Sequence, residues 1–599
     1  MKITIHQMDS AAKKAYLEIG YSEHAAAVFH RRGVDPETAT LLKNNPKKLF
    51  LSPKHLPCIA DVSEQIITFL QKNNREIWIF ADYDVDGITS GYVLTDFLRK
   101  LEHKNDVFVY FPERAEGYGL SMDFCERLIQ RKEETEKEIL LITVDNGVTQ
   151  IGEIEYLQEN DIPCIVTDHH MPKSILPSCF VVDPHVEEKN PLKHLAGCGV
   201  AYKLAEYINN DLGNPVNMDQ YLFAVAIGTV ADIMPMHIEN MAFAAAGLKQ
   251  IKKGDYPHGF KAFLEKLDLG KKITPIDISF EIAPRLNACG RMGDINAGSM
   301  LFFLSDQDEI ESINAIINDI EDLNNQRKSY TQKLKNELLT HSPKTTYIVM
   351  YDISEYPDGI AAIAAGRISD QFGTPSIAYS NREGVCRGSV RSIEGINILP
   401  FLEDAHDEGL VLEFGGHEAA AGISFDVKCK TALENFLDKR IGEEIRKVLE
   451  ERPDKGIISE ITVDGAMNFS DIKKTVYEEI SGLPYDRGAV FPEAQFVFPQ
   501  LRIVSYKNSK NNPDNICFTL EDKDNKKAEV WAWGFGQKYI DLDKPEYITL
   551  IGNITKDFMR NNSYTVRVND IFPEEEPKIE SAPKKKTLLK KKKTKLLQI

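Results

Sequence analysis

Between Glu76 and about Thr229, the chain repeats short apolar runs that alternate with amphipathic, helix-forming stretches. The runs lack the polar alternation of a half-solvated strand, so both of their faces are expected to be covered by protein. This pattern predicts an α/β domain with a parallel sheet, in which ligands bind beyond the carboxyl ends of the strands. The predicted strands are Ile77–Ala81, Val107–Phe111, Ile139–Val144, Cys164–Thr167 and Phe180–Val182.

Other patterns flank this sheet. Apolar residues such as Ile313, Ile317 and Ile320 recur at helical spacing among charges, which predicts a long helix between two domains. Five short apolar runs near the end of the chain are typical of a small β barrel. The predicted division is an N-terminal helical segment over 1–60, the parallel-sheet domain over 61–304, a bridging helix over 305–342, a smaller α/β domain that opens with a strand at Thr346–Met350 over 343–455, an oligonucleotide-binding-like barrel over 456–573 and a disordered lysine-rich tail over 574–599.

One predicted strand of the barrel carries three aromatic residues. Trp531, Trp533 and Phe535 alternate along it and would therefore share one face. Burial in the barrel core is the first interpretation, and stacking on nucleic-acid bases is the second. Both interpretations place the three rings side by side on a regular strand.

The composition fits a globular protein of several domains. The chain has 599 residues, of which 42% are hydrophobic and 27% charged, and no apolar run approaches the roughly 18 residues of a membrane span. The N-terminus lacks the pattern of a secretory signal, so the predicted compartment is the cytoplasm and no membrane partner is expected. Nine cysteines occur without a CxxC pair, which argues against a zinc knuckle and a disulfide framework.

The formal net charge of −19 opposes binding to nucleic acid over most of the surface. Eight lysines lie between Lys584 and Lys595, so the remainder of the chain is more acidic still. A polyanion site must therefore be a local basic pocket or must recruit metal ions. The lysine tail would add sequence-independent attraction to DNA or serve as a solubilising extension.

Acidic residues cluster immediately after the first predicted strand. Asp82, Asp84 and Asp86 alternate in one turn, and three carboxylates this close repel one another unless a cation holds them. A polar turn with a helix cap at Ser90 is the alternative interpretation. The loop does not fit an EF-hand, because it follows a strand and has Val93 at its twelfth position.

Later strand ends repeat this feature. The third, fourth and fifth strands end in Asp145, in Asp168-His169-His170 and in Asp183, and another apolar run closes on Asp232. A single aspartate at a strand end is best explained as a helix cap. Helix capping does not explain why aspartates recur at successive strand ends. Oxygen and imidazole ligands without thiolate favour Mn²⁺ or Mg²⁺, and two such ions can hydrolyse a phosphodiester or phosphoanhydride bond. No serine elbow, cysteine nucleophile or Walker loop offers a competing site.

With these residues the sequence resembles the DHH phosphoesterase superfamily and, within it, the RecJ family of single-strand-specific exonucleases. The resemblance runs from about Val28 to Phe572, with the motifs in the family's order. It implies a parallel-sheet DHH domain, a DHHA1 substrate domain and an OB-like domain. Besides the acidic strand ends, the shared motifs are Gly117–Leu120, Gly197–Ala201, Gly228–Asp232, Ala283–Ala288, Gly388–Ser392 and Phe414–His417.

The resemblance also implies roles for individual residues. Asp145 and His169 would belong to a two-ion Mn²⁺ or Mg²⁺ centre with Asp145 as the bridge, Asp168 would orient the histidine pair, and His170 would contact the scissile phosphate or the leaving oxygen. A solvated surface position is the alternative for any single arginine, and a plain turn for the glycines. The implied metal ligands are Asp82, Asp84, Asp86, Asp145, His169 and Asp232. The implied strand-binding residues are Arg114, Tyr118, Arg285, Asn287, Arg291, Ser389, Arg391, Gly415, Gly416 and His417.

The chain departs from the family pattern at three places outside these ligands. The family's Gly-Glu-Asn-Arg reads Ile238-Glu239-Asn240-Met241 here, its Trp-His reads Tyr356-Pro357, and its Ala-Ser-Arg reads Ala365-Gly366-Arg367. These changes fall at positions that are expected to affect how the substrate is held.

The implied function is a metal-dependent exodeoxyribonuclease that degrades single-stranded DNA from the 5′ end in DNA repair and recombination. A single-strand-binding protein or a helicase is the kind of protein partner that this activity implies. The first alternative is a DHH phosphodiesterase acting on short oligonucleotides or cyclic dinucleotides, against which the long helix and the barrel argue. The second is a non-catalytic DNA-bound scaffold, which the presence of every metal-binding acid disfavours.

Overall fold

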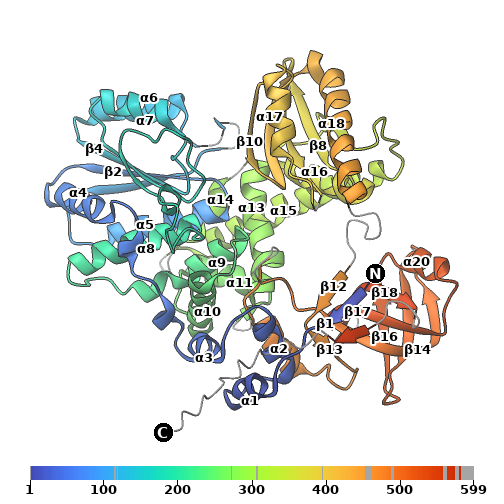
Figure 1. The fold of residues 1–599 in the computed structure, drawn as a ribbon. Helices are drawn as coiled ribbons and strands as arrows, with labels where there is room; N and C mark the ends of the chain where they lie inside the picture. The colour runs from blue at the N-terminus through green and yellow to red at the C-terminus, as the bar shows by residue number, and fades with distance from the viewer. Residues whose placement is uncertain are drawn as a thin grey trace, which may run out of the picture. The chain divides into compact units, whose positions relative to one another are not determined.

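A computed structural model of the protein divides the chain into two units (Figure 1). The large unit comprises Thr40–Ile457 and Gly482–Pro492, and the small unit comprises Met1–Ala39, Ile458–Ser481 and Glu493–Ile599. The structure describes residues 2–113, 116–117, 119–270, 273–293, 295–304, 308–393, 395–451, 460–486, 491–510, 512–557, 563–573 and 579–581. None of the helices within these residues is long and apolar enough to cross a membrane.

The large unit contains the predicted parallel sheet. Its strands are β2 (Glu76–Ala81), β3 (Asp106–Tyr110), β4 (Ile139–Val144), β5 (Cys164–Thr167) and β6 (Phe180–Val182). They lie in the order β3-β2-β4-β5-β6, and all neighbours are parallel. Helices cover both faces, which confirms the predicted α/β architecture (Figure 1). On one side are α6 (Met122–Thr135) and α7 (Ile151–Glu159), and on the other α4 (Ile59–Gln71), α5 (Val85–Arg99) and α8 (Gly197–Asp211).

A helical region follows the sheet. Its helices are α9 (Leu222–Ala231), α10 (Ile238–Lys253), α11 (His258–Lys266), α12 (Pro275–Asp277), the π-helical turn η7 (Ile278–Ile282), α13 (Ala283–Met292), α14 (Ile295–Met300) and the long α15 (Ile310–Leu338). Helix α15 lies where the bridging helix was expected. Its buried face includes Ile313, Ile317 and Ile320, as the helical spacing of these residues predicts. Short 3₁₀ turns are η1 (Pro46–Leu49), η2 (Pro53–His55), η4 (Pro184–Val186), η5 (Met218–Tyr221), η8 (Asp358–Ile360) and η9 (Val427–Cys429).

The second sheet of the large unit is mixed. Its strands are β7 (Val349–Asp352), β8 (Ser376–Arg382), β9 (Val385–Arg391), β10 (Glu413–His417) and β11 (Ala420–Asp426), in the order β10-β11-β9-β8-β7. Its helices are α16 (Ala361–Phe372), α17 (Leu399–Asp407) and α18 (Lys430–Glu451). The first strand begins later than the sequence predicts, because the backbone N–H groups of Thr346 and Tyr347 donate to Asp438 Oδ1 at 2.8 and 2.6 Å.

The small unit contains the predicted barrel-like sheet. Its strands are β13 (Gly465–Ala466), β14 (Phe496–Asn508), β15 (Ile516–Glu521), β16 (Lys527–Ala532), β17 (Tyr547–Asp557) and β18 (Ser563–Pro573), with helices α19 (Lys474–Ser481) and α20 (Gly536–Asp541). The expected core position of three alternating aromatic residues is wrong. Strand β16 ends at Ala532, the stacked ring of Trp533 is 54% exposed, and Phe535 caps α20. Gly534 has φ +80°, and this turn redirects the chain.

The N-terminal residues belong to the small unit rather than to a separate helical segment. Their elements are β1 (Lys2–Ile5), α1 (Ser10–Glu18), α2 (Glu23–Arg31) and α3 (Pro36–Asn44), of which α3 begins in the small unit and ends in the large one. Strand β1 pairs in parallel with β12 (Glu460–Val463) and with β19 (Ile579–Ser581). Strand β19 lies in the stretch expected to be disordered, and the rest of 574–599 is outside the described residues.

Buried charges attach these N-terminal residues to the sheet. The Asp464 side chain is fully buried and pairs with Arg31 at 3.2 Å and with Arg32, whose side chain is 3% exposed. The other carboxylate oxygen of Asp464 accepts the backbone N–H of Gln495 at 2.8 Å. A local pattern of apolar residues cannot reveal these contacts, because the partners lie more than 400 positions apart in the chain.

Candidate metal centre

The turn after β2 holds its carboxylates with backbone amides. Asp84 caps α5, and its Oδ1 accepts the N–H groups of Asp86 and Gly87 at 2.9 and 3.1 Å. The buried Asp86 carboxylate in turn accepts the N–H groups of Gly197 and Cys198 at 2.6 and 2.9 Å, at the start of α8. The cap of α5 is therefore Asp84, whereas Ser90, the expected cap, lies inside this helix. The N–H groups at the start of α8 hold the Asp86 carboxylate in place. The sequence shows the Gly197–Ala201 motif but not this contact with Asp86.

Asp145 follows β4 in a left-handed conformation with φ +62°. Aspartate tolerates this region better than most residues, because its short side chain can bond locally. The side chain is 3% exposed, and its Oδ1 lies 3.0 Å from His169 Nε2. A Cβ atom on Gly197 would lie 2.6 Å from the Cβ of Asp145, so this close approach requires glycine there.

The triplet after β5 orients two imidazoles differently. Asp168 Oδ1 lies 2.8 Å from His170 Nδ1, and Oδ2 accepts the N–H of Val148 at 3.0 Å. His169 turns the other way, with Nε2 at 3.7 Å from Asp86 Oδ2 and 3.8 Å from Asp232 Oδ2. Asp168 therefore holds His170, while His169 faces the carboxylates.

Asp232 follows a helix and not a strand. The apolar run before it resembles the runs that form the strands before the other aspartates, but it folds as α9. Asp232 is the residue after α9, whose carbonyl end carries partial negative charge and disfavours an acid. An acid at this end of a helix, such as Asp232, is expected where a cation compensates its charge. Asp183 has a simpler role, since it caps η4 by accepting the N–H of His185 at 2.7 Å.

Electrostatics favour a cation in this cluster, named here the acid cluster (Asp82, Asp84, Asp86, Asp145, His169 and Asp232). Burial and, after it, neighbouring carboxylates raise the pKa of Asp84, and raise the pKa values of Asp145 and Asp232 well above the usual range. Burial lowers the pKa of His169, which keeps its imidazole neutral and able to bind a metal. Three overlapping groups have ligand atoms within 4.8 Å of one another, namely Asp82 with Asp84 and Asp145, Asp86 with His169 and Asp232, and Asp145 with His169 and His170.

His170 differs from its neighbour in charge. Burial would lower its pKa, but the hydrogen bond and charge of Asp168 outweigh this effect and raise the pKa to about 9. The hydrogen bond from His170 likewise holds the pKa of Asp168 below its usual value, although burial opposes it. A cationic His170 beside the acid cluster is suited to contact an anionic substrate.

A cavity of about 240 Å³ opens on the acid cluster, and α13 forms part of its wall. Asn287, Gly290 and Arg291 line this wall. Asn287 Oδ1 accepts the N–H of Val85 at 3.2 Å, and Arg291 Nη1 donates to the carbonyl of Gly359 at 3.2 Å. Helix α13 thus contacts both the acidic turn and the second α/β domain, and it places two predicted substrate-binding residues beside the cluster.

Gly290 is expected to be intolerant of even one added methyl group. A Cβ there would lie 2.5 Å from the carbonyl oxygen of Tyr83, which is backbone inside the acidic turn. We expect Gly290→Ala to displace α13 and to weaken binding of Mn²⁺, measured by isothermal titration, by about 10-fold or more. Gly152→Ala is the matched control, because nothing lies within 4 Å of its added Cβ. Equal metal affinity in both variants would contradict this packing.

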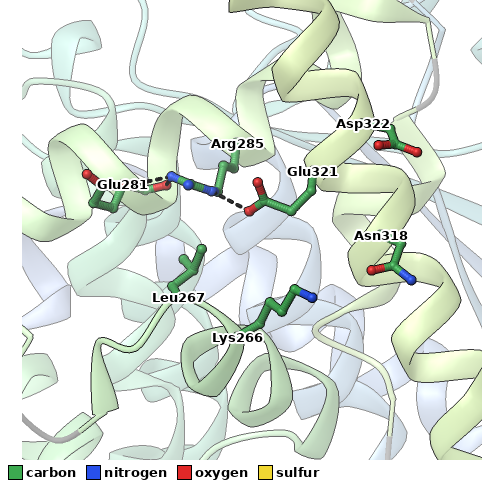
Figure 2. Close-up of a pocket in the computed structure, with 7 residues that line it drawn as sticks. All are labelled: Lys266, Leu267, Glu281, Arg285, Asn318, Glu321 and Asp322. Carbon is green, nitrogen blue, oxygen red and sulfur yellow. Dashed lines mark hydrogen bonds and ion pairs between the residues drawn. The ribbon is translucent and has the colours of Figure 1, made fainter.

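Arg285 is not brought to the acid cluster. Its Nε donates to Glu321 on α15 at 2.5 Å, and its Nη1 donates to Glu281 Oε2 at 2.7 Å and to the Glu281 carbonyl at 2.8 Å. Figure 2 shows the guanidinium between the two glutamates, in a separate pocket of about 630 Å³ that also includes Lys266 and Asp322. The structure therefore places Arg285 at this separate pocket, with Nε and Nη1 bonded to glutamates, and not beside the acid cluster.

Five of the other predicted strand-binding residues, Ser389, Arg391, Gly415, Gly416 and His417, lie on the second sheet. Ser389 and Gly415 face the same residue of β11, Gly422, in the strand register, and Arg391 and His417 likewise face Ala420. A Cβ on Gly416 would lie 2.4 Å from the carbonyl oxygen of Ala420. None of these residues is among those that line the 240 Å³ cavity. Arg114 and Tyr118 fall outside the described residues.

Two residues that depart from the family pattern are buried, whereas Ile238 is 39% exposed. Met241 is 6% exposed within α10, and Tyr356 is 4% exposed, with its hydroxyl donating to Glu337 at 2.5 Å. Neither residue lines the acid-cluster cavity.

Three family models match successive parts of the chain. They are the DHH family N-terminal domain over residues 76–229, the DHHA1 domain over 344–446 and the RecJ OB domain over 463–570. The RecJ single-stranded-DNA-specific exonuclease of Haemophilus influenzae is 31% identical over 498 residues, which cover 80% of this chain and 83% of the relative.

Solved structures agree with this match. The crystal structure of Thermus thermophilus RecJ with Mn²⁺ has a TM-score of 0.77 at 23% identity, covers 97% of this chain and 80% of its own, and shows the same fold. A crystal structure of exonuclease RecJ bound to manganese is 28% identical, with a TM-score of 0.55, and covers 65% of this chain and 95% of its own.

Fold and acid cluster together define a phosphoesterase of the DHH class, with acids and imidazoles gathered at one edge of a parallel sheet. The similarity extends through the DHHA1 and OB domains. The chain belongs to the RecJ family.

Proposed function

We propose that the protein is a metal-dependent exonuclease that hydrolyses single-stranded DNA and releases nucleotides from the 5′ end. The acid cluster carries the proposal, because its overlapping sets of carboxylates and imidazoles suit divalent cations. The name of the Haemophilus influenzae relative, a single-stranded-DNA-specific exonuclease, supports the substrate. The 5′-to-3′ direction and a role in DNA repair and recombination come from the resemblance to the family.

Two Mn²⁺ or Mg²⁺ ions fit the donor set. We assign Asp82, Asp84 and Asp145 to one ion and Asp86, His169 and Asp232 to the other, with Asp145 shared because it also lies within ligand distance of His169. Bound ions would supply an activated water and neutralise charge on the phosphate. Manganese in a RecJ structure 28% identical to this chain supports the assignment.

The residues around the ions would hold the strand. His170, kept cationic by Asp168, would contact the scissile phosphate or the leaving oxygen. Arg291 on the cavity wall presents a guanidinium to phosphate oxygens, while Asn287 fixes the wall to the acidic turn. Arg114 and Tyr118 belong to the same proposal. So do the residues of the second sheet, namely Ser389, Arg391, Gly415, Gly416 and His417.

The test is a degradation assay with Mn²⁺ and single-stranded oligonucleotides labelled at either end. We expect immediate release of the 5′ label as mononucleotide, gradual shortening of strands labelled at the 3′ end, and no cleavage of duplex. Chelation of the divalent ions with EDTA should stop the reaction, and added Mn²⁺ should restore it.

Other outcomes would point elsewhere. Cleavage of dinucleotides with intact long strands would replace the proposal with a small-substrate phosphodiesterase. Absence of turnover on every substrate, with the protein still bound to DNA, would support a scaffold. The proposed setting is the cytoplasm, where a helicase makes single strands and a single-strand-binding protein coats them.

A further inference from the structure

The loop after Asp232 carries backbone strain next to the acid cluster. Ile233 has φ +60°, a left-handed conformation that is costly for a β-branched residue. Such a conformation persists only where the surrounding contacts hold it. The contacts that hold this loop therefore also set the position of the Asp232 carboxylate.

Helix α9 and one side chain provide some of these contacts. The N–H groups of Asp232, Ile233 and Met234 donate to carbonyl oxygens near the end of α9 at 2.9, 3.3 and 3.3 Å. On the other side of the loop, the Asn240 side chain donates to the carbonyl of Pro235 at 2.9 Å. These bonds attach the loop to the two helices that flank it in the sequence.

A further contact comes from a segment about 250 residues away. The N–H of Met236 donates to Asp486 Oδ2 at 2.9 Å, and both residues are buried, at 1% and 2% exposure. The same Oδ2 accepts the N–H of Phe491 at 2.9 Å, and the Asp486 N–H donates to the carbonyl of Phe491 at 2.9 Å. Away from water, a charge-assisted bond of this kind is strong.

The described residues of this segment, Gly482–Asp486 and Phe491–Pro492, are called the brace. It belongs to the large unit, although the chain on both sides of it belongs to the small unit. The chain therefore leaves the small unit, contributes the Asp486 carboxylate to the loop that carries Asp232, and returns to the small unit. An ordinary linker between two units would not need a buried acid that binds a loop of the metal centre.

We propose that Asp486 is a positioning residue for the metal centre. By holding Met236 it maintains the left-handed turn at Ile233, and this turn keeps the Asp232 carboxylate near Asp86 and His169. The inference rests on the proposed function and deepens it, because it assigns part of the affinity for metal to a residue outside both α/β domains.

The experiment is calorimetric titration of Mn²⁺ into the metal-free, full-length protein without DNA. Asp486→Ala should raise the dissociation constant about 10- to 100-fold, as for other residues that position metal ligands. Asp486→Asn keeps an oxygen that can accept both N–H groups, so its affinity should stay within about threefold of the unaltered protein. Binding of single-stranded DNA in EDTA should be unchanged in both variants.

A matched control separates positioning from general destabilisation. Asp522 is also a buried aspartate, 5% exposed, and accepts the N–H groups of Phe469 and Asp524 at 3.0 and 2.9 Å within the small unit. Asp522→Ala should lower thermal stability without changing the affinity for Mn²⁺. Equal weakening of Mn²⁺ binding in the Asp522 and Asp486 variants would overturn the proposal, as would an affinity of Asp486→Ala within twofold of normal.

Strain relief offers a second, independent variant. Glycine adopts φ +60° at no steric cost, so Ile233→Gly combined with Asp486→Ala should recover at least about threefold of the lost affinity. An absence of recovery would overturn the role of the strained turn. Because these titrations contain no substrate, a failure of the unaltered protein to degrade DNA would overturn the proposed function and leave the Mn²⁺ measurements interpretable.

Discussion

Asp145→Asn is expected to abolish hydrolysis while leaving the fold and strand binding intact. Asparagine tolerates the left-handed conformation of this residue, so the backbone at the end of β4 should not change. The substitution removes the carboxylate shared by the two proposed ions. A metal contributes several kcal/mol to the reaction and 1.36 kcal/mol corresponds to a factor of ten, so the rate should fall by about 10³-fold or more. The measurement is label release under single-turnover conditions.

Two comparisons make this result specific. Affinity for single-stranded DNA, measured by fluorescence anisotropy in EDTA, should change little for Asp145→Asn and for Asp145→Ala. Asp123→Ala, an exposed aspartate on α6, should keep the full rate. Unchanged turnover in Asp145→Asn would exclude the assignment of this residue as the bridging ligand.

The largest loss of stability is expected from Arg32→Met. This substitution removes the guanidinium that pairs with the fully buried Asp464 and leaves the carboxylate with Arg31, which is partly exposed. Loss of one partner from a buried ion pair costs about 3–5 kcal/mol, so the free energy of unfolding of the small unit should fall by roughly that amount. Urea unfolding in a Trp78→Phe background measures it, since the remaining tryptophans, Trp531 and Trp533, both lie in the small unit.

The control for this prediction is another arginine of the small unit. Arg502 pairs with Glu521 at the surface, and its side chain is 46% exposed. Surface pairs contribute little, so Arg502→Met should leave the unfolding midpoint nearly unchanged. If Arg32→Met and Arg502→Met unfold at the same urea concentration, the N-terminal residues are not part of the cooperative small unit.

Local patterns in the sequence were sufficient to predict the parallel sheet and much of the acid cluster. Strands such as Ile139–Val144 are continuously apolar, and parallel strands bring their carboxyl ends to one edge of a sheet. The order of residues alone therefore places Asp82 and Asp145 together. The apolar run before Asp232 also indicated this residue, although the run forms the helix α9 and not a strand.

Contacts between distant residues were not predictable in this way. Arg285 looks like a phosphate-binding residue in its motif, and only the packing of α13 near α15 brings Glu321 to its guanidinium. Asp486 carries no motif, and its contact with Met236 depends on the path of the brace. Strand β16 ends at Ala532, so the regular alternation of its side chains has already ended at Trp533. The turn at Gly534 then separates Trp533 from the helix α20.

The three-stranded sheet of β12, β1 and β19 has a consequence for biosynthesis. Strand β1 is made before both of its partners, which lie after residue 459 in the chain. At about 5–20 residues per second, the first strand waits on the order of 20 to 90 s for a partner. The parallel sheet of the large unit lies entirely between these partners in the chain, so it can form during this interval, whereas the small unit can only close once its later strands have been made.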